Sequence, residues 1–122
     1  MTEIAISVAL HDIVRFALPA NSEYCVGADV AARQVRWAVI VGVPLRRDEL
    51  MEIGDIVIVA ERSDEPDWES AIGQFAEIEV AAVVVNRPVP SNALEIAAAA
   101  ELPIVRVPSD SDLRAIHRGV LT

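Results

Sequence analysis

The chain has 122 residues, the size of a single domain, and this length can bury a substantial core without disulfides or bound metal. Hydrophobic residues make up 53% of the chain but aromatic residues only 4%, so the core is expected to consist of Ala, Val, Ile and Leu. The formal net charge is −9, and an acidic surface repels the phosphates of nucleic acids. The chain is therefore not expected to bind DNA or RNA by itself.

The sequence carries no sign of a membrane span, a secretory signal or a disulfide. Its apolar runs are much shorter than the ~20 residues that a membrane helix needs. The start, Met1-Thr2-Glu3, lacks the basic residues of a signal peptide. Cys25 is the single cysteine, so an internal disulfide cannot form. We expect a cytoplasmic protein with no membrane partner.

In chain order, the first elements are one helix and two strands. A helix is expected over residues 8–18, because apolar residues recur there with helical spacing and Pro19 bars its continuation. Residues 24–26 are expected to form a short edge strand. Residues 33–41 are a β-branched run with few charges, which predicts a second strand. The charged segment 46–53 is expected to make one or two helical turns.

The rest of the chain alternates strands with helices. The Ser-Asp-Glu-Pro segment at residues 63–66 is typical of a helix start, and Trp68, Ile72 and Phe75 recur on one face of the helix that follows. The expected elements are, in order, a strand over 56–60, the helix after 63–66, a strand over 80–85, a helix over 91–101, a strand over 104–107 and an amphipathic helix over 113–120.

Short strands that are apolar on both faces, joined by helices, are typical of a parallel sheet with helices on its two faces. The fold class is therefore expected to be α/β. We expect a single domain over residues 1–122, with a mostly parallel sheet of about five strands flanked by helices.

Several segments together carry a family resemblance that covers residues 8–118. They are, in order, Asp12-Ile13-Val14 with Leu18-Pro19, Val26-Gly27, Arg33-Gln34-Val35-Arg36-Trp37-Ala38-Val39, Gly54-Asp55-Ile56-Val57-Ile58-Val59, residues 80–85, and Leu102-Pro103-Ile104 with Val107-Pro108. In this pattern the chain resembles the N-terminal domain of the PucR family of bacterial transcriptional regulators, named for purine catabolism.

The resemblance implies a non-catalytic sensory or regulatory domain that responds to a small-molecule effector and forms a homodimer. It also implies that DNA is bound only through a separate C-terminal helix-turn-helix. Because the chain ends at Thr122 without one, we expect it to be a fragment of a longer regulator. Ala60-Glu61-Arg62 stands where family members often have a Thr-Thr-Gly turn, so a pocket built on that turn would differ here.

The candidate ligand-binding residues are Arg36, Trp37, Arg62, Asn86 and Arg87. Ligands of open parallel sheets gather beyond the carboxyl ends of the strands, where Arg62, Asn86 and Arg87 are expected. These side chains suit an anionic or heterocyclic molecule. Arg33, Arg36 and Trp37 stand together in the second strand, and alternation places Arg36 and Trp37 on opposite faces. One of them is expected to line a ligand or interdomain surface.

The residue pattern does not favour catalysis, metal binding or cofactor binding. His11 and His117 have no second histidine or cysteine at metal spacing, and Cys25 is expected to pack as a small hydrophobe. The sequence contains no phosphate loop and no Ser/His/Asp set. We therefore expect a protein that is not an enzyme and takes no cofactor or metal. Two alternatives stay open: a ligand-free oligomerisation module, and a small nucleotide-binding or enzymatic domain.

Overall fold

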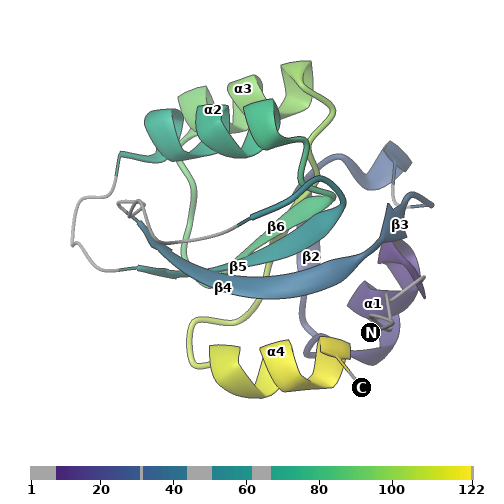
Figure 1. Cartoon of the computed structure of the whole chain (residues 1–122). Coiled ribbons are helices and arrows are strands. Elements are labelled where there is room, and N and C mark those ends of the chain that lie inside the picture. The colour runs from purple at the N-terminus through teal and green to yellow at the C-terminus, as the bar shows by residue number, and fades with distance from the viewer. Residues whose placement is uncertain (1–7, 31, 44–50, 62–66, 122) are drawn as a thin grey trace.

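A computed structural model describes residues 8–30, 32–43, 51–61 and 67–121 of the chain. They form three layers, with one sheet between two groups of helices (Figure 1). Helices α2 and α3 lie on one face of the sheet, and α1 and α4 lie on the other. The α/β class that the sequence predicts is confirmed.

The central sheet has five strands in the order β2-β7-β6-β5-β4. Its strands are β2 (Glu23–Val26), β4 (Trp37–Val43), β5 (Asp55–Glu61), β6 (Ala82–Val85) and β7 (Ile104–Arg106). Strands β4 to β7 are parallel to one another, whereas β2 pairs antiparallel with β7 at one edge. The expected edge strand over residues 24–26 is thus confirmed. A separate two-stranded sheet joins β1 (Val8–Ala9) to β3 (Gln34–Val35).

The helices are α1 (Leu10–Phe16), α2 (Trp68–Ile78), α3 (Ser91–Ala99) and α4 (Leu113–Leu121), with a 3-10 turn at Ala28–Val30. Aspartates cap two of them, because a carboxylate accepts the free amide hydrogens of a first turn. Asp67 accepts from the amide of Ser70 at 3.1 Å, and Asp112 accepts from the amide of Arg114 at 3.1 Å. None of these helices, in the part of the chain described, is long and apolar enough to cross a membrane.

The core consists of two apolar clusters, one on each face of the sheet. Alternation along β5 shows the reason. Val57 and Val59 face α2 and α3, whereas Ile56 and Ile58 face α1 and α4, and all four side chains are fully buried. Burial on both faces explains why the parallel strands contain almost no polar residues.

Three sequence-based assignments were wrong, whereas the ends of the other expected strands and of the two last helices differ by at most two residues. The first helix begins at Leu10, because Val8 and Ala9 pair with β3. The second strand is broken at Arg36, whose amide donates to the carbonyl of Gly54 at 2.8 Å, so it forms β3 and then β4. Residues 51–53 form no helix and lead into a turn at Gly54; the rest of the helical segment expected at 46–53, and the helix start at 63–66, lie outside the described residues.

Candidate functional site

The structure does not bring the five predicted ligand-binding residues together. Arg36 and Trp37 lie where β4 begins, at the amino ends of the parallel strands. Asn86 and Arg87 follow β6 and lie at the opposite edge, beyond the carboxyl ends. Arg62 lies outside the residues that the structure describes. Ligand binding by these residues stays a prediction, but they cannot all belong to one pocket.

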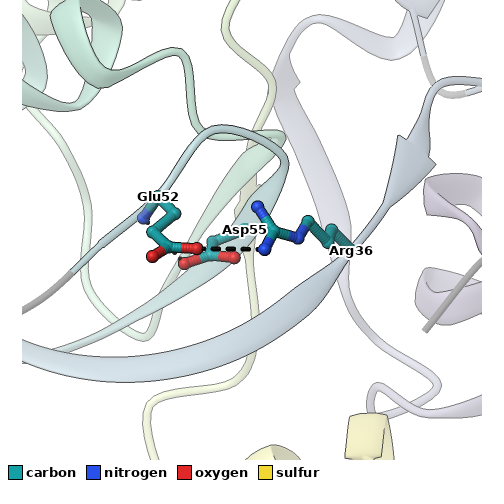
Figure 2. A network of polar contacts seen from close by, with 3 residues as sticks. All are labelled: Arg36, Glu52 and Asp55. Carbon is teal, nitrogen blue, oxygen red and sulfur yellow. Dashed lines mark hydrogen bonds and ion pairs between the residues drawn. The ribbon is translucent and has the colours of Figure 1, made fainter. Parts of the chain in front are cut away.

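Polar contacts gather instead at the amino ends of β4 and β5 (Figure 2). A guanidinium nitrogen of Arg36 lies 3.2 Å from a carboxylate oxygen of Glu52. The backbone amide of Glu52 donates to the Asp55 carboxylate at 2.8 Å. Both side chains of the ion pair are about half exposed (47% and 65%), so water screens it and it contributes ~0–1 kcal/mol. The ion pair links Arg36 to the turn that precedes β5, and it contributes little to stability.

Asp55 is the one charged residue that the described structure buries, with 4% of its surface exposed. Burial raises the pKa of its carboxyl group, because water no longer stabilises the charged form. The backbone amide of Asp55 donates to Glu52, and its carbonyl accepts from the amide of Ala81 at 2.7 Å. Asp55 therefore joins the turn before β5 to the start of β6.

Arg33 connects three segments at the same edge of the molecule. One guanidinium nitrogen donates to the carbonyl of Glu101 at 3.0 Å, and the other lies 3.5 Å from the carbonyl of Ala81. Glu101 follows α3, and Ala81 precedes β6. Arg33 thus holds the segment before β3 against the end of a helix and the start of a strand. The sequence singled out Arg33, but its partners are 48 and 68 residues away in the chain.

A pocket of about 210 Å³ opens beside Arg33, at the carboxyl ends of α2 and α3. Its wall includes Arg33, Glu79 and Glu101, together with Ala76 and Ala100. Glu79 and Glu101 have backbone φ angles of 64° and 55°, in the left-handed region that favours glycine. Neither glutamate stands out in the sequence, because only the folded chain brings the two helix ends together.

The other residues considered from the sequence have structural partners or lie apart. A ring nitrogen of His117 lies 3.0 Å from the carbonyl of Ala38 on β4, and His11 lies 3.5 Å from the Asp12 carboxylate. Burial raises the pKa of the Cys25 thiol, which favours its neutral form. Among the described residues, no group of three or more histidine, cysteine or acidic side chains is placed to hold a metal ion.

No protein-family model and no curated protein matches this sequence. Among solved structures, the chain is similar to the crystal structure of the CBS and DRTGG domains from the regulatory region of Clostridium perfringens pyrophosphatase, complexed with the activator diadenosine tetraphosphate. The TM-score is 0.61 and the sequence identity 15%, over 93% of this chain and 46% of that one. The chain thus spans about half the length of that regulatory region, and it shares an α/β fold with it.

Proposed function

We propose that this chain is a non-catalytic regulatory domain that binds a small-molecule effector. The observation that carries the proposal is the similarity of 93% of the chain to a regulatory region that was crystallised with its activator. The sequence resemblance supports a finer version, in which the domain belongs to a cytoplasmic PucR-like transcriptional regulator. It would then control a DNA-binding module that lies outside this chain.

An effector can regulate such a module only by binding two arrangements of the domain with different affinities. The amino-end edge of the sheet is a suitable place, because the hydrogen bonds of Asp55 and Arg33 connect β5, β6 and the end of α3 there. A ligand that moves one of these segments relative to another changes contacts in both helix layers. The acidic net charge of −9 agrees with DNA binding by another segment rather than by this chain.

The experiment is a thermal-shift screen of the purified chain against purine bases, their breakdown products, adenine nucleotides and diadenosine tetraphosphate, together with other metabolites. A ligand at about 100 times its dissociation constant stabilises a protein by about 2.7 kcal/mol, which raises the melting temperature of a chain of this size by several degrees. We expect at least one compound to do so at millimolar concentration. A screen in which no metabolite stabilises the chain would contradict effector binding.

A second candidate function is that of an oligomerisation module without a ligand. The observation that favours it is β4, which forms the edge of the central sheet and contains no charged residue. Pairing with a second chain would have to replace the contact of His117 with the carbonyl of Ala38. Edge strands usually carry charges or prolines that prevent pairing with another chain. A homodimer that forms through β4, with no response to any metabolite, would favour this function over effector binding.

A further inference from the structure

We propose that Arg33 links the two helix layers, so that a displacement at the end of α3 on one face of the sheet is transmitted to the start of α1 on the other face. The inference goes beyond the proposed function and holds whether or not an effector binds. It rests on the contacts of one residue with segments that lie on opposite sides of the central sheet (Figure 1).

Arg33 lies in a segment that runs along the amino ends of the parallel strands. The described residues that join β2 to β4 are 27–30 and 32–36. Arg33 contacts Ala81, which precedes β6, and the amide of Arg36 donates to Gly54, which precedes β5. The segment therefore passes around an edge of the sheet, where a contact can be made with both helix layers.

The guanidinium of Arg33 holds the end of α3. One nitrogen donates to the carbonyl of Glu101 at 3.0 Å, and the other lies 3.5 Å from the carbonyl of Ala81. Hydrogen bonds from a charged donor are stronger than those between neutral groups. Glu101 is itself tied to the helix, because its amide donates to the carbonyl of Ala98 at 3.1 Å. A shift of the last turn of α3 therefore moves an atom that Arg33 contacts.

The backbone carbonyl of Arg33 holds the start of α1. This helix has no side-chain cap, and the amide of Leu10 donates instead to the Arg33 carbonyl at 2.9 Å. The contact continues the pairing of β1 with β3, in which Ala9 stands opposite Gln34. The side chain of Leu10 is fully buried in the apolar cluster on this face of the sheet. A movement of the Arg33 main chain therefore displaces a core residue of the α1 layer.

The main chain of Arg33 has no other slack on its amide side. Its amide donates to the carbonyl of Val30 at 3.1 Å, so its amide, its carbonyl and its guanidinium each have a partner. A shift of the Glu101 carbonyl then either moves the Arg33 main chain or breaks the guanidinium contact. In both cases the hydrogen bond between Arg33 and Leu10 changes.

Amide hydrogen exchange on the full chain tests the link residue by residue. Arg33→Met removes the guanidinium and keeps the carbonyl that accepts from Leu10. We expect the amides of α1 to exchange about fivefold faster in this variant, because the segment loses hydrogen bonds from a charged donor and opens locally. Arg33→Lys keeps the charge and should give a smaller increase, and it serves as the test if the methionine variant does not fold.

Arg36→Met is the matched control. Arg36 lies in the same segment, but its contact with Gly54 uses the backbone amide, and its side chain makes only the exposed ion pair with Glu52. The amides of α1 should therefore exchange in this variant as they do in the unmodified chain. Unchanged exchange of α1 in Arg33→Met would overturn the inference. Equal acceleration of α1 and β5 would also overturn it, because the variant would then have lost stability as a whole.

A second change tests transmission from α3. Ala98 is exposed near the end of this helix, and Ala98→Gly weakens its last turn. We expect the amides of α1 to exchange about twofold faster in Ala98→Gly, and the double variant with Arg33→Met to exchange as Arg33→Met alone does. An equal effect of Ala98→Gly with and without Arg33 would show that α3 acts on α1 by another route, which would refute the link.

Discussion

Asp55 shows how one buried residue can position an edge of the sheet. Its carboxylate accepts the amide of Glu52, and its carbonyl accepts the amide of Ala81, so one residue ties together two strands and a turn. The cost is a charge that is nearly removed from water. This cost depends on pH, because burial raises the pKa of the carboxyl group.

Asp55→Asn removes the negative charge of the side chain but keeps an oxygen that can accept the hydrogen bond from Glu52. The folded-state pKa of Asp55 lies above the unfolded value of about 4, so the folded chain binds the proton more tightly. The contribution of Asp55 to stability is therefore greatest below pH 4 and declines as the pH rises through the folded-state pKa. We expect Asp55→Asn to gain stability relative to the unmodified chain between pH 3.5 and pH 7.

Urea unfolding at both pH values measures this change, with Asp110→Asn as the control because Asp110 is exposed. At pH 3.5 the folded Asp55 is mostly neutral and the side-chain oxygen of the asparagine can still accept from Glu52, so the variant should differ from the unmodified chain there by about 1 kcal/mol at most. The same difference in unfolding free energy at both pH values would show that the buried charge has no cost.

At the scale of elements, two glycines differ in whether a side chain could replace their hydrogen: one position has no room for a Cβ atom, and the other has. Gly27 follows β2 with a φ angle of 82°, and a Cβ atom built there would lie 2.5 Å from the Cα of Pro103. Gly73 lies inside α2, where an added Cβ would meet no atom of the described chain within 4 Å. The first glycine permits β2 to approach the start of β7, whereas the second only weakens its helix.

Gly27→Ala should lower the free energy of unfolding by about 3 kcal/mol, because the backbone angle and the close approach both oppose a side chain. Gly73→Ala should raise it by about 0.5–1 kcal/mol, because alanine favours the helix. Chemical denaturation of the two variants provides the comparison. A Gly27→Ala variant as stable as the unmodified chain would contradict this account of the contact between β2 and β7.

The sequence predicted the type and order of nearly all elements, because β-branched runs and helical periodicity are local signals. The break at Arg36 was not predictable, since it depends on the bond to Gly54, which is distant in the chain. The same limit applies to the site. Arg33 stood out in the sequence, but Glu79 and Glu101 are ordinary acidic residues until folding brings two helix ends to one place.

At the scale of the whole molecule, the net charge and the edge strands of the central sheet govern association with other molecules. The net charge of −9 disfavours association between copies at long range. Strand β4 is the uncharged edge that pairing at short range would use, and His117 already lies 3.0 Å from the carbonyl of Ala38 on this strand. Trp37, at the start of this edge, keeps 44% of its surface exposed. If the second candidate function holds, the affinity of a homodimer through β4 should rise with salt, because the repulsion is then screened.

Trp37→Lys should weaken this dimer at least tenfold, because it adds a charge to the pairing edge and removes an apolar contact. Sedimentation equilibrium at several protein concentrations gives the dissociation constant, and circular dichroism checks that the fold is retained. Phe16→Ser is the control, because Phe16 is more exposed (74%) and belongs to α1, which is not part of the central sheet. A chain that stays monomeric at high concentration and high salt would refute pairing through β4.

The division of the core by a single sheet has a consequence for any signal that the domain carries. The side chains under α2 and α3 are separated from those over α1 and α4 by one thickness of backbone. A shift of α2 and α3 can therefore reach the other compartment through the strands whose side chains alternate between the two clusters, among them β5 and β6. Backbone amide chemical shifts along these two central strands are where communication between the compartments should be visible.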